Sequence, residues 1–186
     1  MRKHPYEILL DRKRKWSPVK PTVGKLKNGS KDTIRRALAA RHLELPVGSF
    51  IKEGLEKDVP ANARKLLEDN VKDEERHDLA LGYYADALGT NEKEEKEGKL
   101  LRDAWINHPD HTITKALVAE RAIFFVLLPL FRFNGCAALR TLSADISGTS
   151  RSMSERILLY VASWAYVLLL LWINLGKPPL TGLWNL

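Results

Sequence analysis

Apolar residues recur at helical spacing through most of the chain, beginning near residue 32. The first such segment covers residues 32–57, where Asp32 or Thr33 can cap the first turn and Pro46 is expected to kink the helix. The second segment covers residues 60–88, opens at a proline and is followed by Gly89-Thr90-Asn91. These spans predict two long amphipathic helices joined by a short connection.

Two further segments are more apolar. One begins near residues 108–112 and continues to Phe133, before Asn134-Gly135 stops or bends it. The other extends from Cys136 to Leu175. No segment alternates with a period of two, so the pattern predicts an all-α fold with four long helical stretches, a four-helix bundle. We expect the charged stretch 92–99 to be an exposed helix start or a linker.

Residues 1–31 have no sustained period and contain three prolines, so they are predicted to form a largely irregular arm. The chain carries 30 Lys and Arg against 23 Asp and Glu, a formal charge of +7. Residues 1–41 alone hold 13 basic and three acidic residues, a charge of +10, and the remaining residues are slightly acidic. We therefore predict three parts: a basic arm (1–31), a helical bundle (32–177) and a tail (178–186).

Composition excludes several classes of protein. A single cysteine, Cys136, forms no internal disulfide, and a thiolate zinc site is not expected. An apolar content of 45% is too high for a disordered chain. The N-terminal residues lack the apolar stretch of a secretory signal, so we expect an intracellular or particle-borne protein and not a secreted one.

The segment 157–175 has no formally charged residue. As a helix it would be about 28 Å long, which is close to the thickness of a bilayer core. It could therefore span a membrane, or it could pack on the apolar third helix in a bundle core or at an oligomer interface. The sequence leaves both possibilities open.

A few acidic residues and one histidine stand out within the helices. Glu74 and His77 form a Glu-x-x-His pair, and their spacing places both side chains on one helical face. A carboxylate with an imidazole suits iron(II) or manganese(II). Glu44 precedes Glu74 by 30 residues on the preceding helix, and Glu120 lies within the apolar stretch ALVAERAIFFVLLP. A carboxylate in such surroundings is costly unless it is paired or binds a metal.

This pattern resembles the ferritin-like di-iron carboxylate superfamily, which includes the small subunit of ribonucleotide reductase, over roughly residues 32–175. The resemblance implies a ferritin-like bundle, an iron or manganese cofactor, and Glu44, Glu74, His77 and Glu120 as ligands. If the halves repeat, Ser150 and Met153 stand where the family has its second Glu and His. A hydroxyl and a thioether are poor ligands for hard divalent iron, so the second ligand set is predicted to be degenerate.

Three interpretations of the four predicted ligands stay open. They could bind a dinuclear centre or a single metal ion. They could instead be a vestigial polar cluster whose carboxylates are satisfied by hydrogen bonds or by pairing with Arg76, Arg121 or Arg132.

The leading functional hypothesis is a structural or assembly component, for example of a virion or another multi-subunit particle, that forms homo- or hetero-oligomers. The basic arm, including Arg12, Lys13, Arg14 and Lys15, would contact nucleic acid, an anionic lipid surface or an acidic protein. The first alternative is an iron- or manganese-dependent oxidase of the di-iron carboxylate class, with no catalytic residue assigned beyond the ligands. The second alternative is a helical protein anchored in a membrane through residues 157–175.

Overall fold

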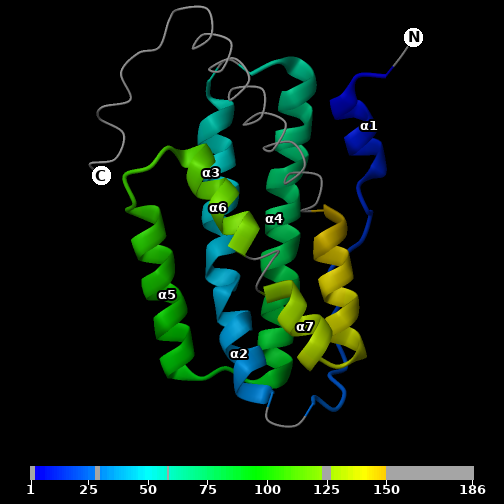
Figure 1. Cartoon of the computed structure of the whole chain (residues 1–186), viewed down its shortest axis with the longest axis vertical. Coiled ribbons are helices and arrows are strands. Elements are labelled where there is room, and N and C mark those ends of the chain that lie inside the picture. The colour runs from blue at the N-terminus through cyan, green and yellow to red at the C-terminus, as the bar shows by residue number, and fades with distance from the viewer. Residues whose placement is uncertain (1–2, 28–29, 58, 123–126, 150–186) are drawn as a thin grey trace, which may run out of the picture. The chain divides into compact units, whose positions relative to one another are not determined.

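A computed structural model describes residues 3–27, 30–57, 59–122 and 127–149 (Figure 1). These residues form helices and irregular segments without a β-strand, which confirms the all-α prediction for this part of the chain. Ser150, Met153, the apolar segment 157–175 and the tail 178–186 lie outside the described residues. The elements are α1 (Pro5–Arg12), α2 (Lys31–Ala39), the 3₁₀ turn η1 (Ala40–Leu43), α3 (Glu44–Leu55), α4 (Ala61–Leu88), α5 (Glu92–Ile106), α6 (Thr112–Ala122), α7 (Leu128–Asn134) and a last helical stretch, residues 137–149.

The first predicted helix is divided into α2, η1 and α3, and its irregularity lies one turn before the expected kink at Pro46. Pro46 is the third residue of α3, where a missing N–H is tolerated. In a continuous helix this proline could not bond the carbonyl of His42, and its ring would clash with it. The chain therefore passes through the 3₁₀ turn at residues 40–43 before α3 begins at Glu44.

The second predicted helix is confirmed as α4. Pro60 is its N-cap residue, and Gly89 ends it with a φ of 75°, a conformation that favours glycine. Arg35 of α2 donates from Nε to the carbonyl of Gly89 (2.9 Å) and from Nη2 to that of Leu88 (3.0 Å). These bonds satisfy carbonyls at the end of α4 and tie α2 to it.

The charged stretch 92–99 is the first half of α5, so the expected helix start is confirmed and the alternative, a linker, is wrong; within it Glu94 and Gly98 are buried. Asn91 caps this helix by accepting from the amide of Lys93 (2.9 Å). Glu95 accepts from both terminal nitrogens of Arg41, each at 2.7 Å, and lies 2.9 Å from Nε2 of His42. These contacts hold α5 against η1, and the ion pair with Arg41 lowers the pKa of Glu95.

Gly98 permits the close approach of α5, because a Cβ there would lie only 2.6 Å from the carbonyl oxygen of Ala39. We expect Gly98→Ala to destabilise the protein by about 1–2 kcal/mol, since the overlap outweighs the better helix propensity of alanine. Gly82→Ala in α4 is the matched control. A Cβ at Gly82 meets nothing within 4 Å, so this change should stabilise by about 1 kcal/mol. Urea unfolding of both variants measures the two effects, and a Gly98→Ala variant as stable as the wild type would contradict this packing.

The remaining helices pack around α2, α3 and α4. α6 and α7 cover the third predicted helix, and α7 ends at Asn134 as expected. α3 packs against both α4 and α6, and α2 against α4, α5 and α7 (Figure 1). A hydrophobic core joins α2, α4, α7 and residues 137–149; its large members include Ile34, Leu38, Leu81, Phe131, Leu139 and Ile146.

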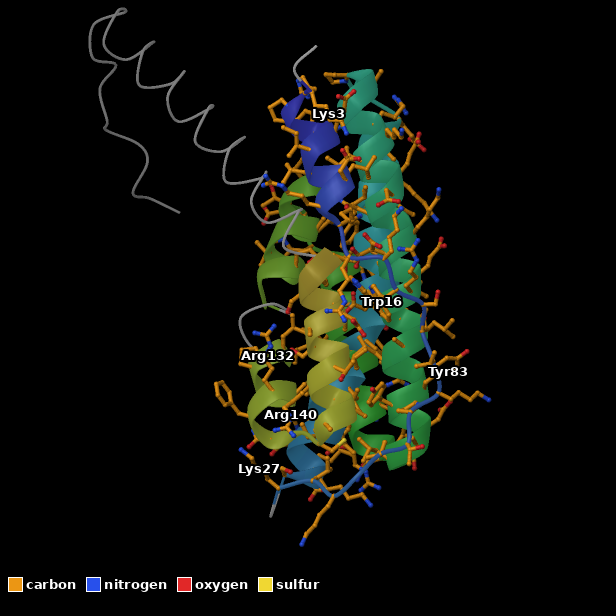
Figure 2. The ribbon with its side chains drawn as sticks, turned by 90° about the vertical axis from the view of Figure 1, so that its right-hand side faces the viewer. Lys3, Trp16, Lys27, Tyr83, Arg132 and Arg140 are labelled. Carbon is orange, nitrogen blue, oxygen red and sulfur yellow. The ribbon has the colours of Figure 1, made fainter. Side chains whose placement is uncertain are left out.

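The predicted arm contains one helix and is otherwise extended. α1 begins with a capping box between His4 and Glu7. Residues 13–27 then follow α4 and the helical stretch 137–149 (Figure 2), and Trp16, Val23 and Leu26 pack against the core. The amide of Lys27 donates to the carbonyl of Asn134 (3.3 Å). Much of this segment is thus part of the packed structure.

Among the described residues, no helix combines the length and apolar character needed to cross a bilayer.

Candidate metal centre

The structure brings three of the four predicted ligands into one buried cluster. Glu44 is the first residue of α3, and Glu74 and His77 lie one turn apart in the middle of α4. Each is only 1–2% exposed, and one possible ligand atom from each lies within 4.8 Å of the others. Gly48, one turn after Glu44, faces Glu74 across the contact between α3 and α4, and a Cβ there would be in ordinary contact with Cβ of Glu74, at 3.4 Å.

His77 is the centre of this cluster. Its Nδ1 lies 3.5 Å from Oε2 of Glu44 and 3.4 Å from Oε2 of Glu74. Its Nε2 lies 2.7 Å from the hydroxyl oxygen of Thr149 in the helical stretch 137–149. The two ring nitrogens thus face different partners.

Each member of the cluster has a buried polar atom without a hydrogen bond among the described residues. These atoms are Oε1 of Glu44, Oε2 of Glu74 and Nδ1 of His77. Buried polar atoms in native proteins are nearly always hydrogen-bonded, and exceptions point to a functional constraint or to a bound group. A divalent cation among these atoms would bind them and offset the carboxylate charges.

Glu120 on α6 is also buried, at 2% exposure, and its charge acts on Glu74. Burial of Glu74, followed by the charge of Glu120, raises the pKa of the Glu74 carboxyl well above its ordinary value. Burial of His77 lowers its pKa, but the negative charges of Glu74 and Glu44 outweigh that effect, and the pKa is raised overall. Without a metal ion, Glu74 and His77 therefore both bind protons more tightly than they would in water.

Two of the three arginines that could have neutralised the cluster have other partners. Arg76 pairs with Asp73 at 2.5 Å. Arg132 donates to the hydroxyl oxygens of Ser143 (2.9 Å) and Ser147 (2.6 Å). The side chain of Arg121 is not among those described. Neither Arg76 nor Arg132 therefore supports the interpretation of a vestigial, arginine-paired cluster.

The N-terminal segment covers the cluster. The ring of Trp16 stacks on that of His77, with 6.1 Å between the centroids and 15° between the planes. Nearby, Lys13 is buried and its ammonium group pairs with Asp69 (2.7 Å) and Asp73, and donates to Asn70 (2.8 Å), all on α4. This lysine fixes the chain three residues before Trp16.

The four basic residues predicted to contact a partner divide into two pairs. Lys13 is buried as described, and Arg14 pairs through Nε with Asp145 at 2.8 Å. The structure thus gives these two cations intramolecular partners instead. Arg12 and Lys15 are exposed, and their contact with an external partner stays a prediction.

Sequence reasoning missed Trp16 and Thr149. A repeat of the first-half spacing pointed to Ser150 as the position of the absent second-half ligand, and Thr149 is its immediate neighbour. Ser150 lies outside the described residues, so its prediction as a ligand position is not tested, and the contact of Thr149 with His77 was not predicted. No signal in the sequence marks Trp16 as a neighbour of His77.

No protein family model, no curated protein and no solved structure matches this chain. The resemblance to the ferritin-like superfamily therefore rests on the residue pattern alone and stays a prediction. What the protein does has to be inferred from the geometry of the described residues.

Proposed function

We propose that this protein binds one divalent transition metal ion, iron(II) or manganese(II), through Glu44, Glu74 and His77. The observation that supports this proposal is the convergence of three buried ligand atoms within 4.8 Å, together with a buried atom on each residue that makes no hydrogen bond. Two carboxylates and one imidazole are a ligand set suited to these metals. Glu120 supplies a further negative charge beside Glu74.

A single ion is a better match than a dinuclear centre. Glu120 does not join the three-residue group whose ligand atoms all lie within 4.8 Å. The proposal therefore keeps a ferritin-like bundle in which the first ligand set is retained and the second, predicted at Ser150 and Met153, is degenerate.

We propose that the ion has a mainly structural role in a component of a larger assembly. Structural metal sites are closed to solvent, and here His77 is 1% exposed, with Trp16 on one face of its ring and Thr149 at Nε2. Exposed large apolar side chains, including Leu100 at 60% and Phe133 at 68% exposure, support contacts with other subunits.

An iron- or manganese-dependent oxidase is the second candidate, and one cavity favours it. A cavity of about 520 Å³ is lined by Leu45 and Pro46, which directly follow Glu44, and by Asp78, which directly follows His77. A small molecule there would lie next to the ligand-bearing turns. Oxygen consumption by iron(II)-loaded protein, above that of iron(II) alone, would favour the oxidase over the structural role.

Metal analysis tests the proposed site. Protein loaded anaerobically with iron(II) or manganese(II) and then desalted should retain about one ion per chain, and Glu74→Ala should retain none. Glu75→Ala is the matched control, because Glu75 is the next residue and its carboxylate lies at the surface, 3.4 Å from Lys52. A folded wild-type protein that retains no metal would contradict the proposal, and retention of two ions would replace the single ion by a dinuclear centre.

A further inference from the structure

The contact between Thr149 and His77 bears on which ring nitrogen would bind the metal. This inference rests on the proposed metal site. Nε2 of His77 and Oγ1 of Thr149 lie 2.7 Å apart, are buried, and join residues 72 positions apart in the sequence. A short, buried hydrogen bond between residues so far apart in the sequence fixes the position of α4 relative to the helical stretch 137–149.

The direction of this hydrogen bond follows from the backbone carbonyls beside the hydroxyl. Oγ1 of Thr149 lies 2.9 Å from the carbonyl oxygen of Ile146 and 3.4 Å from that of Asp145, and a carbonyl can only accept; the shorter contact is with Ile146. The single hydroxyl hydrogen is therefore donated to that carbonyl. A lone pair of Oγ1 then faces Nε2, so Nε2 of His77 carries a hydrogen and donates it.

The opposite edge of the ring faces the carboxylates. Nδ1 lies 3.4–3.5 Å from one carboxylate oxygen of Glu74 and one of Glu44, and it makes no hydrogen bond. Turning the ring over would exchange Nδ1 with Cδ2 and Nε2 with Cε1, and would lose the contacts on both edges. Trp16 stacks nearly parallel on the His77 ring and so helps to hold the ring in this plane.

We propose that Thr149 is a positioning residue that holds His77 as its Nε2–H form, so that Nδ1 binds the metal. The hydroxyl acts through the imidazole and does not itself bind the ion. A histidine ligand commonly donates its other N–H to an oxygen, which fixes both the ring orientation and the tautomer. Here that oxygen comes from the helical stretch 137–149, which in the sequence directly precedes the predicted ligand positions Ser150 and Met153.

Zinc(II) alone is a suitable probe, because it is diamagnetic and binds both carboxylate and imidazole ligands. In the zinc-loaded wild-type protein, ¹⁵N NMR of the His77 ring should show a hydrogen on Nε2 and the metal on Nδ1. Thr149→Val removes the acceptor at nearly constant shape and should weaken zinc binding about 10- to 100-fold. Thr149→Ser keeps the hydroxyl and should restore wild-type affinity.

Thr141→Val is the matched control. Thr141 lies on the same helical stretch, is exposed, and donates its hydroxyl to the carbonyl of Ala137 (3.2 Å), so its loss should leave zinc affinity unchanged. Zinc found on Nε2 would overturn the proposal, as would a Thr149→Val variant that binds like the wild type.

The NMR measurement needs only the wild-type chain, so it decides the question even if Thr149→Val does not fold. A wild-type protein that retains neither zinc, iron nor manganese would instead overturn the proposed function. In that case, an Nε2–H of His77 protected from exchange in the metal-free wild type would still report the hydrogen bond to Thr149.

Discussion

Replacing Lys13 by methionine should destabilise the protein by about 3 kcal/mol and lower its melting temperature by roughly 6–12 °C. The ammonium group of Lys13 is buried between Asp69, Asp73 and Asn70 of α4. Methionine keeps the length of the side chain but removes the charge, and Asp73, at 3% exposure, then loses one of its two cations. The effect is placed at the low end of the range for broken buried pairs because Arg76 still pairs with Asp73.

Lys15→Met is the control for this experiment. Lys15 lies two residues further along the same segment, and the substitution changes the net charge equally, but the side chain is exposed. Its loss should change stability by less than about 0.5 kcal/mol. Thermal unfolding followed by circular dichroism compares the two variants. Equal melting temperatures would show that the pairing of Lys13 with α4 contributes nothing to folding.

Replacing Glu74 by glutamine should stabilise the metal-free protein by about 2 kcal/mol at pH 8. Burial and the charge of Glu120 both disfavour the ionised form of Glu74, which is why its pKa is raised. Glutamine has a similar shape and carries no charge, so it avoids this cost. The same change removes a ligand, so the variant should lose the stabilisation that metal gives the wild type, about 2.7 kcal/mol at a concentration 100 times the dissociation constant.

The stability gained by Glu74→Gln should depend on pH, because the pKa of Glu74 is raised in the folded protein. Because the pKa of Glu74 is higher in the folded state, the folded protein binds a proton that the unfolded chain releases above about pH 4.5. The stability contributed by that proton is fully present below pH 4.5 and is lost as the pH rises through the folded-state pKa. The advantage of glutamine should therefore be absent near pH 4 and grow towards alkaline pH.

Urea titrations at pH 4 and pH 8, in the presence of a chelator, measure the advantage of glutamine. Glu75→Gln, at the surface beside Lys52, should show no comparable trend. A Glu74→Gln variant less stable than the wild type at pH 8 would mean that the attraction between Glu74 and His77 outweighs the cost of burying the carboxylate.

The part of the site that sequence reasoning located depends on local rules. Glu74 and His77 share a face because they are three residues apart on one helix. Glu44 lies beside them because a short connection brings α3 back along α4. Helix spacing and a short loop constrain these positions strongly, so they could be predicted without knowledge of the packing.

The features that were missed depend on contacts between distant parts of the chain. The start of a helix at residue 92 was expected, but the contacts of Glu95 were not, because its partners Arg41 and His42 lie more than 50 residues away in the sequence. A lysine in a dense basic segment is ordinarily exposed, and only the acidic residues on α4 make Lys13 an exception. Composition predicts neither the contacts of Glu95 nor the burial of Lys13, because both depend on how two distant elements pack together.

The position of residues 13–27 across the helical stretch 137–149 has a consequence for the order of folding. The backbone of Arg14 bonds to Gly148, that of Lys27 bonds to Asn134, and His77 bonds to Thr149. Contacts between such distant residues close only after large loops have been formed, which slows folding. During synthesis the N-terminal segment would wait roughly 10 s, at ordinary elongation rates, for its partner helix. Until then its apolar residues and the acidic residues of α4 that pair with Lys13 stay exposed, so the nascent chain is prone to aggregate at this stage.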